Sequence, residues 1–248
     1  LSFGWPAWIL EQMFAYHNRP YANNMNGREA RASEVYLNND FGKMVLGRWT
    51  EMVEKDVIAY GGREYSANQD FLAGEVAMLI QSTSSLSSII ESANFEVGTT
   101  FLPRFEGQGI GNSVIGGASL WVMKGHSEEE YNAVVEFFKY LSQTDVTIQW
   151  HKDTGYFPAT NAAVKTLMDN HWFSENPNYL TAFLQVLSGV QSPAANGVLL
   201  GNFVEIRDIV DNAVEEAFTD VSSADEALDK ADQQADKVLQ DYTELFGE

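Results

Sequence analysis

Residues 111–125 read GNSVIGGASLWVMKG, a glycine-rich turn that leads into a short apolar run and ends at another glycine. The apolar run predicts a strand over residues 118–123. A glycine-rich turn allows a ligand to approach the backbone closely, because no Cβ atom stands in the way. We therefore expect backbone N–H groups at the entrance to this strand to be accessible to a small ligand.

Composition restricts the class of protein. The 248 residues suffice for one large domain or two smaller ones, and an apolar content of 45% excludes a disordered chain. Fifteen basic residues against 35 acidic ones give a formal net charge of −20. Such a charge repels nucleic acids and anionic membrane surfaces, so we expect neither as a partner.

Hydrophobic periodicity and capping signals predict many helices and few strands. Strands are expected over residues 76–80, 95–102 and 118–123. Helices are expected over residues 9–16, 40–57, 66–74, 84–92, 145–152, 161–168, 179–187, 203–218 and 224–242, and a further helix that includes Val134, Val135, Phe138 and Leu141 is expected to open at Ser127. Capping boxes at Ser127 and Ser223 open two of them. The pattern indicates an α/β protein with an all-helical C-terminal third.

No catalytic or metal site can be recognised. The histidines are scattered without metal-ligand spacing, and we expect His17, His126, His151 and His171 at the surface or in packing. The chain has no cysteine, and the serines of residues 82–85 lack the flanking glycines of a nucleophile elbow. We expect a binding protein that is not an enzyme and has no metal or cofactor.

Several residues are candidates for ligand binding, each with a structural alternative. Ser82 precedes a predicted helix, where its hydroxyl and free N–H groups could hold an anion or form an ordinary N-cap. Trp5 and Trp8 share one side of a helical turn and either belong to the core or form an aromatic wall. Arg207 interrupts an apolar helix face, and Tyr156 lies in a turn that could expose its hydroxyl.

The partner of Arg207 is open at this stage. Its guanidinium can pair with a neighbour such as Asp208 or Asp211, or it can bind a phosphate or carboxylate bidentately in a cleft. In a chain so acidic, an anionic ligand would need such a local positive group.

Together these motifs resemble the sn-glycerol-3-phosphate-binding proteins of ABC importers (UgpB type), which are extracytoplasmic solute-binding proteins related to maltose-binding protein. The motifs are Gly4-Trp5-x-x-Trp8, Ser82, Ile115-Gly116-Gly117-Ala118-Ser119-Leu120-Trp121-Val122-Met123, Thr154-Gly155-Tyr156-x-Pro158 and Gly201-Asn202-x-x-x-Ile206-Arg207-x-Ile209-Val210-Asp211.

The resemblance implies a site and a function. The residues that would contact the phosphate or glycerol are Ser82, Gly117 through its N–H, Tyr156 and Arg207, with Trp5 and Trp8 as the aromatic wall. It also implies a periplasmic, monomeric protein that captures glycerol 3-phosphate or a glycerophosphodiester such as glycerophosphocholine between two lobes and docks on membrane permease subunits.

The resemblance covers one lobe only. Members carry a complete first lobe ahead of the tryptophan motif, so we expect a periplasmic-binding-protein-like (type II) second lobe, with the first largely missing. Residues 1–116 would form its α/β part, residues 117–160 would cross to the first lobe, and residues 161–248 would return as helices. Two alternatives stay open: an oligosaccharide ligand on the same fold, and a hydrolase of glycerophosphodiesters.

Overall fold

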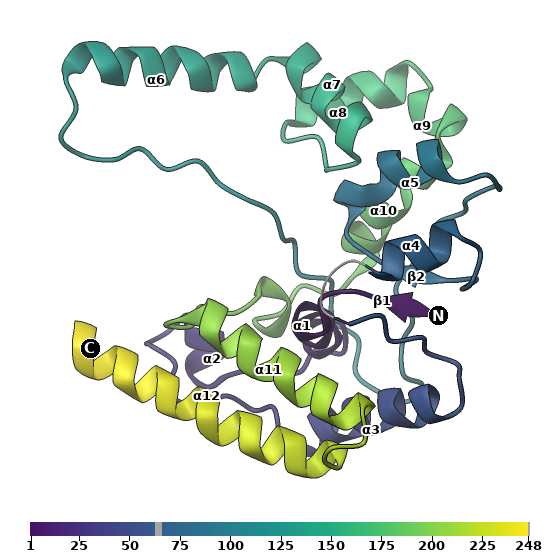
Figure 1. Ribbon diagram of the computed structural model, residues 1–248. Coiled ribbons are helices and arrows are strands. Elements are labelled where there is room, and N and C mark those ends of the chain that lie inside the picture. The colour runs from purple at the N-terminus through teal and green to yellow at the C-terminus, as the bar shows by residue number, and fades with distance from the viewer. Residues whose placement is uncertain (63–65, 248) are drawn as a thin grey trace. The chain divides into compact units, whose positions relative to one another are not determined.

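The structure, a computed structural model, describes residues 1–62 and 66–247, which form two compact units (Figure 1). Unit 1 comprises residues 1–81, 102–115 and 185–248, and unit 2 comprises residues 82–101 and 116–184. One change of unit falls between Ile115 and Gly116, inside the glycine-rich turn. The assignment of residues 117–160 to another lobe remains a prediction.

Unit 1 contains one small parallel sheet and most of the long helices. Its elements are β1 (Ser2–Phe3), α1 (Pro6–Tyr16), α2 (Asn23–Gly27), α3 (Asp40–Glu54), α4 (Ser66–Leu72), β2 (Leu79–Ile80), the 3₁₀ turn η3 (Ala194–Asn196), α11 (Phe203–Phe218) and α12 (Ala224–Phe246). Ser2 of β1 lies opposite Leu79 of β2, and Phe3 lies opposite Ile80.

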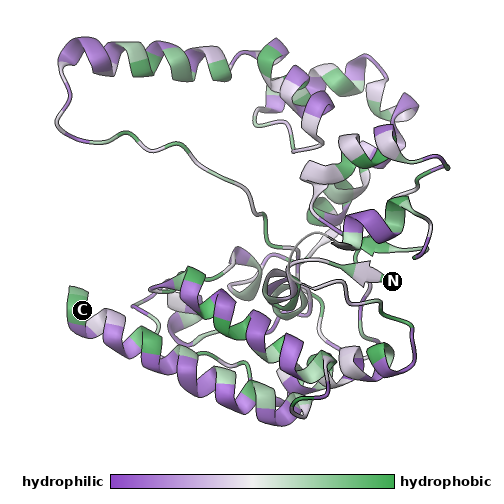
Figure 2. Cartoon of the chain, in the orientation of Figure 1, coloured by the Kyte–Doolittle hydropathy of each residue, from purple (hydrophilic) through white to green (hydrophobic). Residues whose placement is uncertain are grey.

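The core of unit 1 lies between α1, α3, α11 and α12. Helices α11 and α12 run side by side and alternate hydrophobic and hydrophilic residues around their axes (Figures 1 and 2). The buried side chains recur at helical spacing in both, as at Ile206, Val210 and Val214 of α11. Both predicted capping boxes are confirmed, at Ser127 before α6 and at Ser223 before α12.

Unit 2 is helical. Its elements are the 3₁₀ turn η1 (Thr83–Ser85), α5 (Leu86–Ser92), α6 (Glu128–Leu141), α7 (Thr144–Thr154), α8 (Asn161–Asp169), α9 (Trp172–Glu175) and the 3₁₀ turn η2 (Pro177–Tyr179); α10 (Thr181–Ser188) contains the change back to unit 1. Within the described ranges, no helix is both long and apolar enough to cross a membrane.

Three strand predictions need correction. Of the strand predicted over residues 76–80, only Leu79–Ile80 pairs, and the described structure contains no strand at residues 95–102 or 118–123. An apolar run forms a strand only when another strand pairs with it. The predicted helix over residues 84–92 is also split, because a 3₁₀ turn precedes α5.

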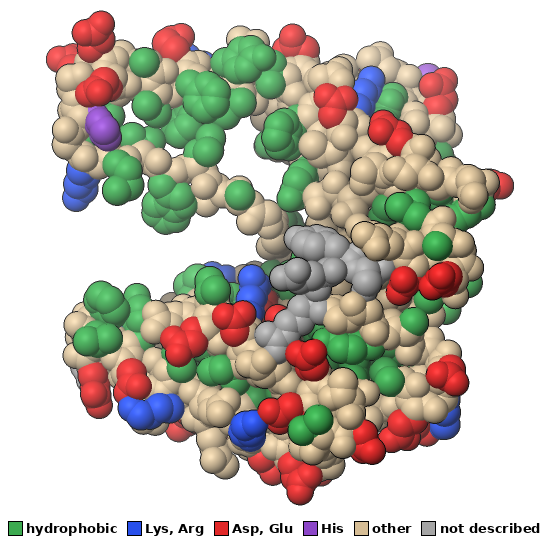
Figure 3. All heavy atoms as spheres, in the orientation of Figure 1, with side chains coloured by type: hydrophobic (Ala, Val, Ile, Leu, Met, Phe, Trp, Pro, Cys, Tyr) green, Lys and Arg blue, Asp and Glu red, His purple; other side chains and the backbone are tan. Residues whose placement is uncertain are grey.

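The apolar segment that follows the glycine-rich turn is exposed in unit 2. Leu120, Trp121 and Met123 are 63%, 85% and 71% exposed, and α6 has no buried residue. Hydrophobic side chains gather on α6 and the extended segment before it (Figure 3). Exposed apolar surface of this extent is typical of interaction surfaces and ligand-binding grooves.

Candidate functional site

Arg207 forms a bidentate ion pair with Glu11. The Nε and Nη2 atoms of Arg207 on α11 donate to the two carboxylate oxygens of Glu11 on α1, at 2.7 and 2.8 Å. The Glu11 side chain is only 8% exposed, whereas that of Arg207 is 42% exposed. Of the alternatives open for Arg207, pairing with a carboxylate is observed, and the carboxylate is that of Glu11 on α1, 196 positions away.

Burial and pairing shift the pKa values of both Glu11 and Arg207. Burial raises the pKa of Glu11, and the hydrogen bonds and charge of Arg207 oppose this rise. The hydrogen bonds to Glu11 raise the pKa of Arg207. A guanidinium has five N–H donors and Glu11 accepts from two, so the exposed edge of Arg207 keeps donors for a further anion.

One aromatic ring stacks on the ion pair, and two tryptophans lie at the start of the helix that carries Glu11. The ring of Phe203, one turn earlier on α11, lies 4.4 Å from the Arg207 guanidinium carbon and stacks against it. On α1, Trp8 precedes Glu11 by three residues and so shares its face of the helix. The rings of Trp5 and Trp8 meet edge to face, with centroids 6.3 Å apart, and both residues are partly buried.

Trp5 adopts a backbone conformation that is rare for its residue type. It is the N-cap of α1 with φ 54° and ψ 61°, in the left-handed region. A left-handed tryptophan costs about 1 kcal/mol or more, and such strain concentrates at functional sites. Asp211 of α11 stabilises the start of α1, because its Oδ1 accepts a hydrogen bond from the Ala7 N–H at 2.7 Å.

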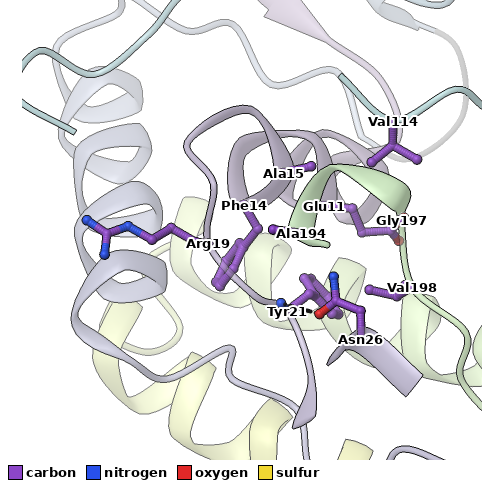
Figure 4. Close-up of a pocket in the computed structure, with 10 residues that line it drawn as sticks. All are labelled: Glu11, Phe14, Ala15, Arg19, Tyr21, Asn26, Val114, Ala194, Gly197 and Val198. Carbon is purple, nitrogen blue, oxygen red and sulfur yellow. Dashed lines mark hydrogen bonds between the residues drawn. The ribbon is translucent and has the colours of Figure 1, made fainter. Parts of the chain in front are cut away.

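A small cavity with a mainly apolar lining lies beside Glu11 in unit 1. Glu11, Tyr21 and Asn26 lie around this space (Figure 4), and the space open to the centre of a water molecule is about 10 Å³. The Tyr21 hydroxyl and the Asn26 Nδ2 are buried, and neither has a hydrogen-bond partner among the described residues. The cavity has about the minimum size for one water.

Unit 2 brings the other candidates together. The Ser82 hydroxyl accepts hydrogen bonds from the Ser84 N–H at 3.3 Å and the Ser84 hydroxyl at 3.0 Å, so it caps η1 as the structural alternative expected. Gly155 ends α7 with φ 86° and packs on this turn: a Cβ there would lie 2.3 Å from the Thr83 carbonyl oxygen.

Tyr156 follows Gly155 and lies beside Gly117. His151 Nδ1–H donates to the Tyr156 carbonyl oxygen at 2.5 Å, which holds the backbone of the turn. A Cβ at Gly117, where φ is 125°, would contact the Tyr156 ring at 4.0 Å. Unit 2 therefore places the Ser82 turn against Gly155 and the Tyr156 ring against Gly117.

The six predicted site residues thus form two clusters. The arginine cluster of unit 1 consists of Trp5, Trp8, Glu11, Phe203 and Arg207, and the hydroxyl cluster of unit 2 consists of Ser82, Gly117 and Tyr156. Sequence reasoning missed Glu11 and Phe203. Their spacing was the available signal: Glu11 follows Trp8 by three residues and Phe203 precedes Arg207 by four, so each shares a helix face with a predicted site residue.

The histidines have packing or surface roles, as predicted. His17 and His151 are each 1% exposed, and burial lowers the pKa of both. His17 Nδ1–H donates to the Met13 carbonyl oxygen, and its Nε2 accepts from the Phe105 N–H at 3.0 Å. His126 and His171 are exposed.

Known proteins resemble this chain in sequence. The sn-glycerol-3-phosphate-binding periplasmic protein UgpB of Rhizobium meliloti (strain 1021) is 35% identical over 229 residues, which are 92% of this chain and 53% of that protein. UgpB of Escherichia coli (strain K12) is 32% identical over 96% of this chain and 55% of its own length. The chain spans about half the length of these relatives, and the resemblance inferred from the motifs is confirmed.

Solved structures share the fold. UgpB from Mycobacterium tuberculosis in complex with glycerophosphocholine has a TM-score of 0.73 at 19% identity, over 97% of this chain and 58% of that one. The cyclic alpha-maltosyl-1,6-maltose binding protein from Arthrobacter globiformis has a TM-score of 0.67 at 17% identity, over 97% and 59%. The predicted fold class, a periplasmic-binding-protein-like lobe, is confirmed.

Residues 3–181, which are most of the chain, match the family of bacterial extracellular solute-binding proteins. The fold of the solved structures agrees with it. This chain belongs to the bacterial extracellular solute-binding protein family.

Proposed function

We propose that the protein is the substrate-binding component of an ABC importer and captures glycerol 3-phosphate or a glycerophosphodiester. The observation that carries the proposal is Arg207, whose guanidinium is fixed by Glu11 and Phe203 yet remains 42% exposed. The names of the relatives and of the glycerophosphocholine complex support the same class of ligand.

The arginine cluster supplies charge and an apolar surface. The exposed edge of Arg207 donates to phosphate oxygens, and Glu11 keeps the guanidinium plane in place. Trp5 and Trp8 present aromatic surface to the glycerol carbons or, in a choline ester, to the trimethylammonium group.

The hydroxyl cluster supplies neutral donors. The Ser82 and Tyr156 hydroxyls and the Gly117 N–H bind phosphate or glycerol oxygens without adding charge. The left-handed conformation of Gly117 and the packing of Tyr156 against it support this role.

The family also supports proposals about location and partners. Members of this family are extracellular solute-binding proteins. We propose that this protein has no catalytic activity, acts as a periplasmic monomer and delivers its ligand to membrane permease subunits. We also propose that residues 117–160 pack against a further lobe, since the side chains of residues 120–123 are exposed and no residue of α6 is fully buried in unit 2.

Titration calorimetry on the full natural chain tests the ligand. Glycerol 3-phosphate or glycerophosphocholine should bind, and Arg207→Met should weaken binding at least about tenfold, since a hydrogen bond to a charged group contributes roughly 1.5–3 kcal/mol. The matched control is Arg48→Met, because Arg48 is an exposed arginine paired with Glu51 on α3. The control should bind as the wild type does.

A second variant separates binding from folding. Arg207→Met alone leaves Glu11 buried without a partner, which destabilises the protein. Combining it with Glu11→Gln removes the unpaired charge, and this double variant should fold and still fail to bind. Retained affinity in the double variant would overturn the role of Arg207.

An oligosaccharide ligand is the second candidate, because an edge-to-face pair of tryptophans also suits a sugar face. Binding of a maltodextrin that is insensitive to Arg207→Met would favour it over a phosphate ligand. Release of free choline from glycerophosphocholine would instead identify a hydrolase, whereas recovery of the intact ligand supports capture.

A further inference from the structure

His151 is a buried histidine whose two ring nitrogens have different surroundings. It lies on α7 and is 1% exposed. Its Nδ1 atom is 2.5 Å from the Tyr156 carbonyl oxygen, and because a carbonyl oxygen only accepts, Nδ1 carries the proton and donates. Its Nε2 atom is buried and has no hydrogen-bond partner among the described residues. The geometry therefore favours the neutral Nδ1–H tautomer of this ring.

Three aromatic rings form a box around the imidazole. The centroid of the Trp172 ring on α9 lies 5.1 Å from that of the imidazole, and the centroids of Phe173 on α9 and Tyr179 on η2 each lie 5.6 Å from it. Phenylalanine has no polar atom, and an indole N–H only donates. The Tyr179 hydroxyl already pairs with the Ser87 hydroxyl of α5 at 2.9 Å. A second N–H, at Nε2, would therefore lack an acceptor in this aromatic box.

The surroundings also disfavour a positive charge on the ring. Burial lowers the pKa of His151, the hydrogen bond to the Tyr156 carbonyl opposes this effect, and the charge of Lys152, its neighbour on α7, adds to it. The elements packed against the ring bring no compensating charge to it: α9 presents two rings that do not titrate, η2 presents the phenol of Tyr179, and α5 presents the Ser87 hydroxyl behind that phenol. A protonated ring is therefore stabilised by leaving the box for water.

The hydrogen bond from His151 holds the turn on which the hydroxyl cluster depends. It fixes the Tyr156 carbonyl, and the Tyr156 ring in turn lies 4.0 Å from the Cβ position of Gly117. Gly155 of the same turn packs on the Thr83 carbonyl oxygen, in the 3₁₀ turn that follows Ser82. If the imidazole leaves the box, the turn loses this bond.

We propose that His151, in addition to its packing role, is a positioning residue of the ligand site in unit 2: its Nδ1–H holds the Tyr156 carbonyl and so keeps the Tyr156 hydroxyl and the Gly117 N–H in the arrangement that binds the ligand. This inference rests on the proposed function and adds to it a residue that acts through Tyr156. It also makes affinity depend on the protonation of one buried histidine.

Two variants separate the hydrogen bond from the packing. His151→Asn keeps an N–H donor near the position of Nδ1 but fills the box poorly, whereas His151→Phe fills the box and removes the donor. In titration calorimetry of the full natural chain with glycerophosphocholine at neutral pH, the phenylalanine variant should bind at least about fivefold more weakly than the asparagine variant. His171→Asn is the matched control, because it makes the same substitution at an exposed position of unit 2. It should bind as the wild type does.

NMR on the wild type keeps the inference testable even if a variant fails to fold. Nitrogen spectra of protein with labelled histidine should show the Nδ1–H tautomer of His151 at neutral pH, and an Nε2–H tautomer would overturn the inference. As the pH falls, the affinity of the wild type relative to His151→Asn should fall in step with the neutral fraction of His151. Glycerophosphocholine keeps its charge, because a phosphodiester has no second ionisable proton. The ratio also cancels other titrating groups, such as Glu11.

The outcomes separate this inference from the proposed function. If the wild type binds neither glycerol 3-phosphate nor glycerophosphocholine, the proposed function fails and the inference fails with it. If the wild type binds and His151→Phe binds as well as His151→Asn or better, His151 only packs, and the inference is overturned while the proposed function stands. An affinity ratio that stays constant while His151 becomes protonated overturns it in the same way.

Discussion

Replacing Gly155 by alanine should loosen the part of unit 2 that carries Ser82 and Tyr156. The left-handed conformation at φ 86° costs alanine about 1 kcal/mol of stability. Its Cβ would lie 2.3 Å from the Thr83 carbonyl oxygen, so the backbone of one segment has to move by at least 0.7 Å to restore a 3.0 Å contact. Displacement of packed backbone costs a further 1–3 kcal/mol, roughly, so the total is about 2–4 kcal/mol.

Gly125→Ala is the control, because Gly125 is also in unit 2 with φ 94° and has nothing within 4 Å of its Cβ position. It should lose only the conformational part, about 1 kcal/mol. Hydrogen exchange followed by mass spectrometry, on peptides that cover residues 82–92 and α7, measures the local free energy of opening. Equal loss of protection in the two variants would refute the reasoning, since the contact with Thr83 would then contribute nothing.

Three further predictions concern unit 1. Burial raises the pKa of Asp232 in the folded state. Between the pKa of the unfolded state and this raised pKa, the folded state holds more protons, so the free energy of unfolding falls as pH rises. Asp232→Asn keeps an acceptor for the Leu37 N–H and should flatten this part of the pH dependence measured by urea unfolding. Gln12→Ala removes both hydrogen bonds between its amide and the backbone of Val114, at 2.9 and 3.0 Å, and should speed amide exchange at Val114 at least about fivefold. Ser223→Ala removes the N-cap of α12 and should destabilise unit 1 by about 1 kcal/mol in the same urea assay, whereas an unchanged midpoint would contradict the capping role.

The helices were largely predictable because their signals are local. The predicted range of residues 203–218 is that of α11, and the capping boxes at Ser127 and Ser223 form as predicted. Helix α1 begins at Pro6, a residue suited to a first turn, and Asp211 supports this turn by accepting the Ala7 N–H. That contact joins distant parts of the chain and leaves no local pattern.

Strands depend on partners, and this explains the errors there. Residues 118–123 have the composition of a strand, yet strand pairing is a property of two segments. The side chains of Leu120 and Trp121 are exposed in unit 2. If residues 117–160 pack against a further lobe, as proposed, hydrogen exchange in the full natural chain should show strong protection of residues 118–123. Rapid exchange there would contradict that part of the proposal.

In the candidate site, too, features set by neighbouring residues were predictable and contacts between distant segments were not. Arg207 could be selected from the sequence because it interrupts an apolar helix face, but nearby acids were the natural candidates for its partner. Glu11 becomes the partner because α1 and α11 pack together, and a guanidinium half buried against α1 needs a carboxylate on that side. The same packing that fixes the arginine therefore also places a carboxylate beside it.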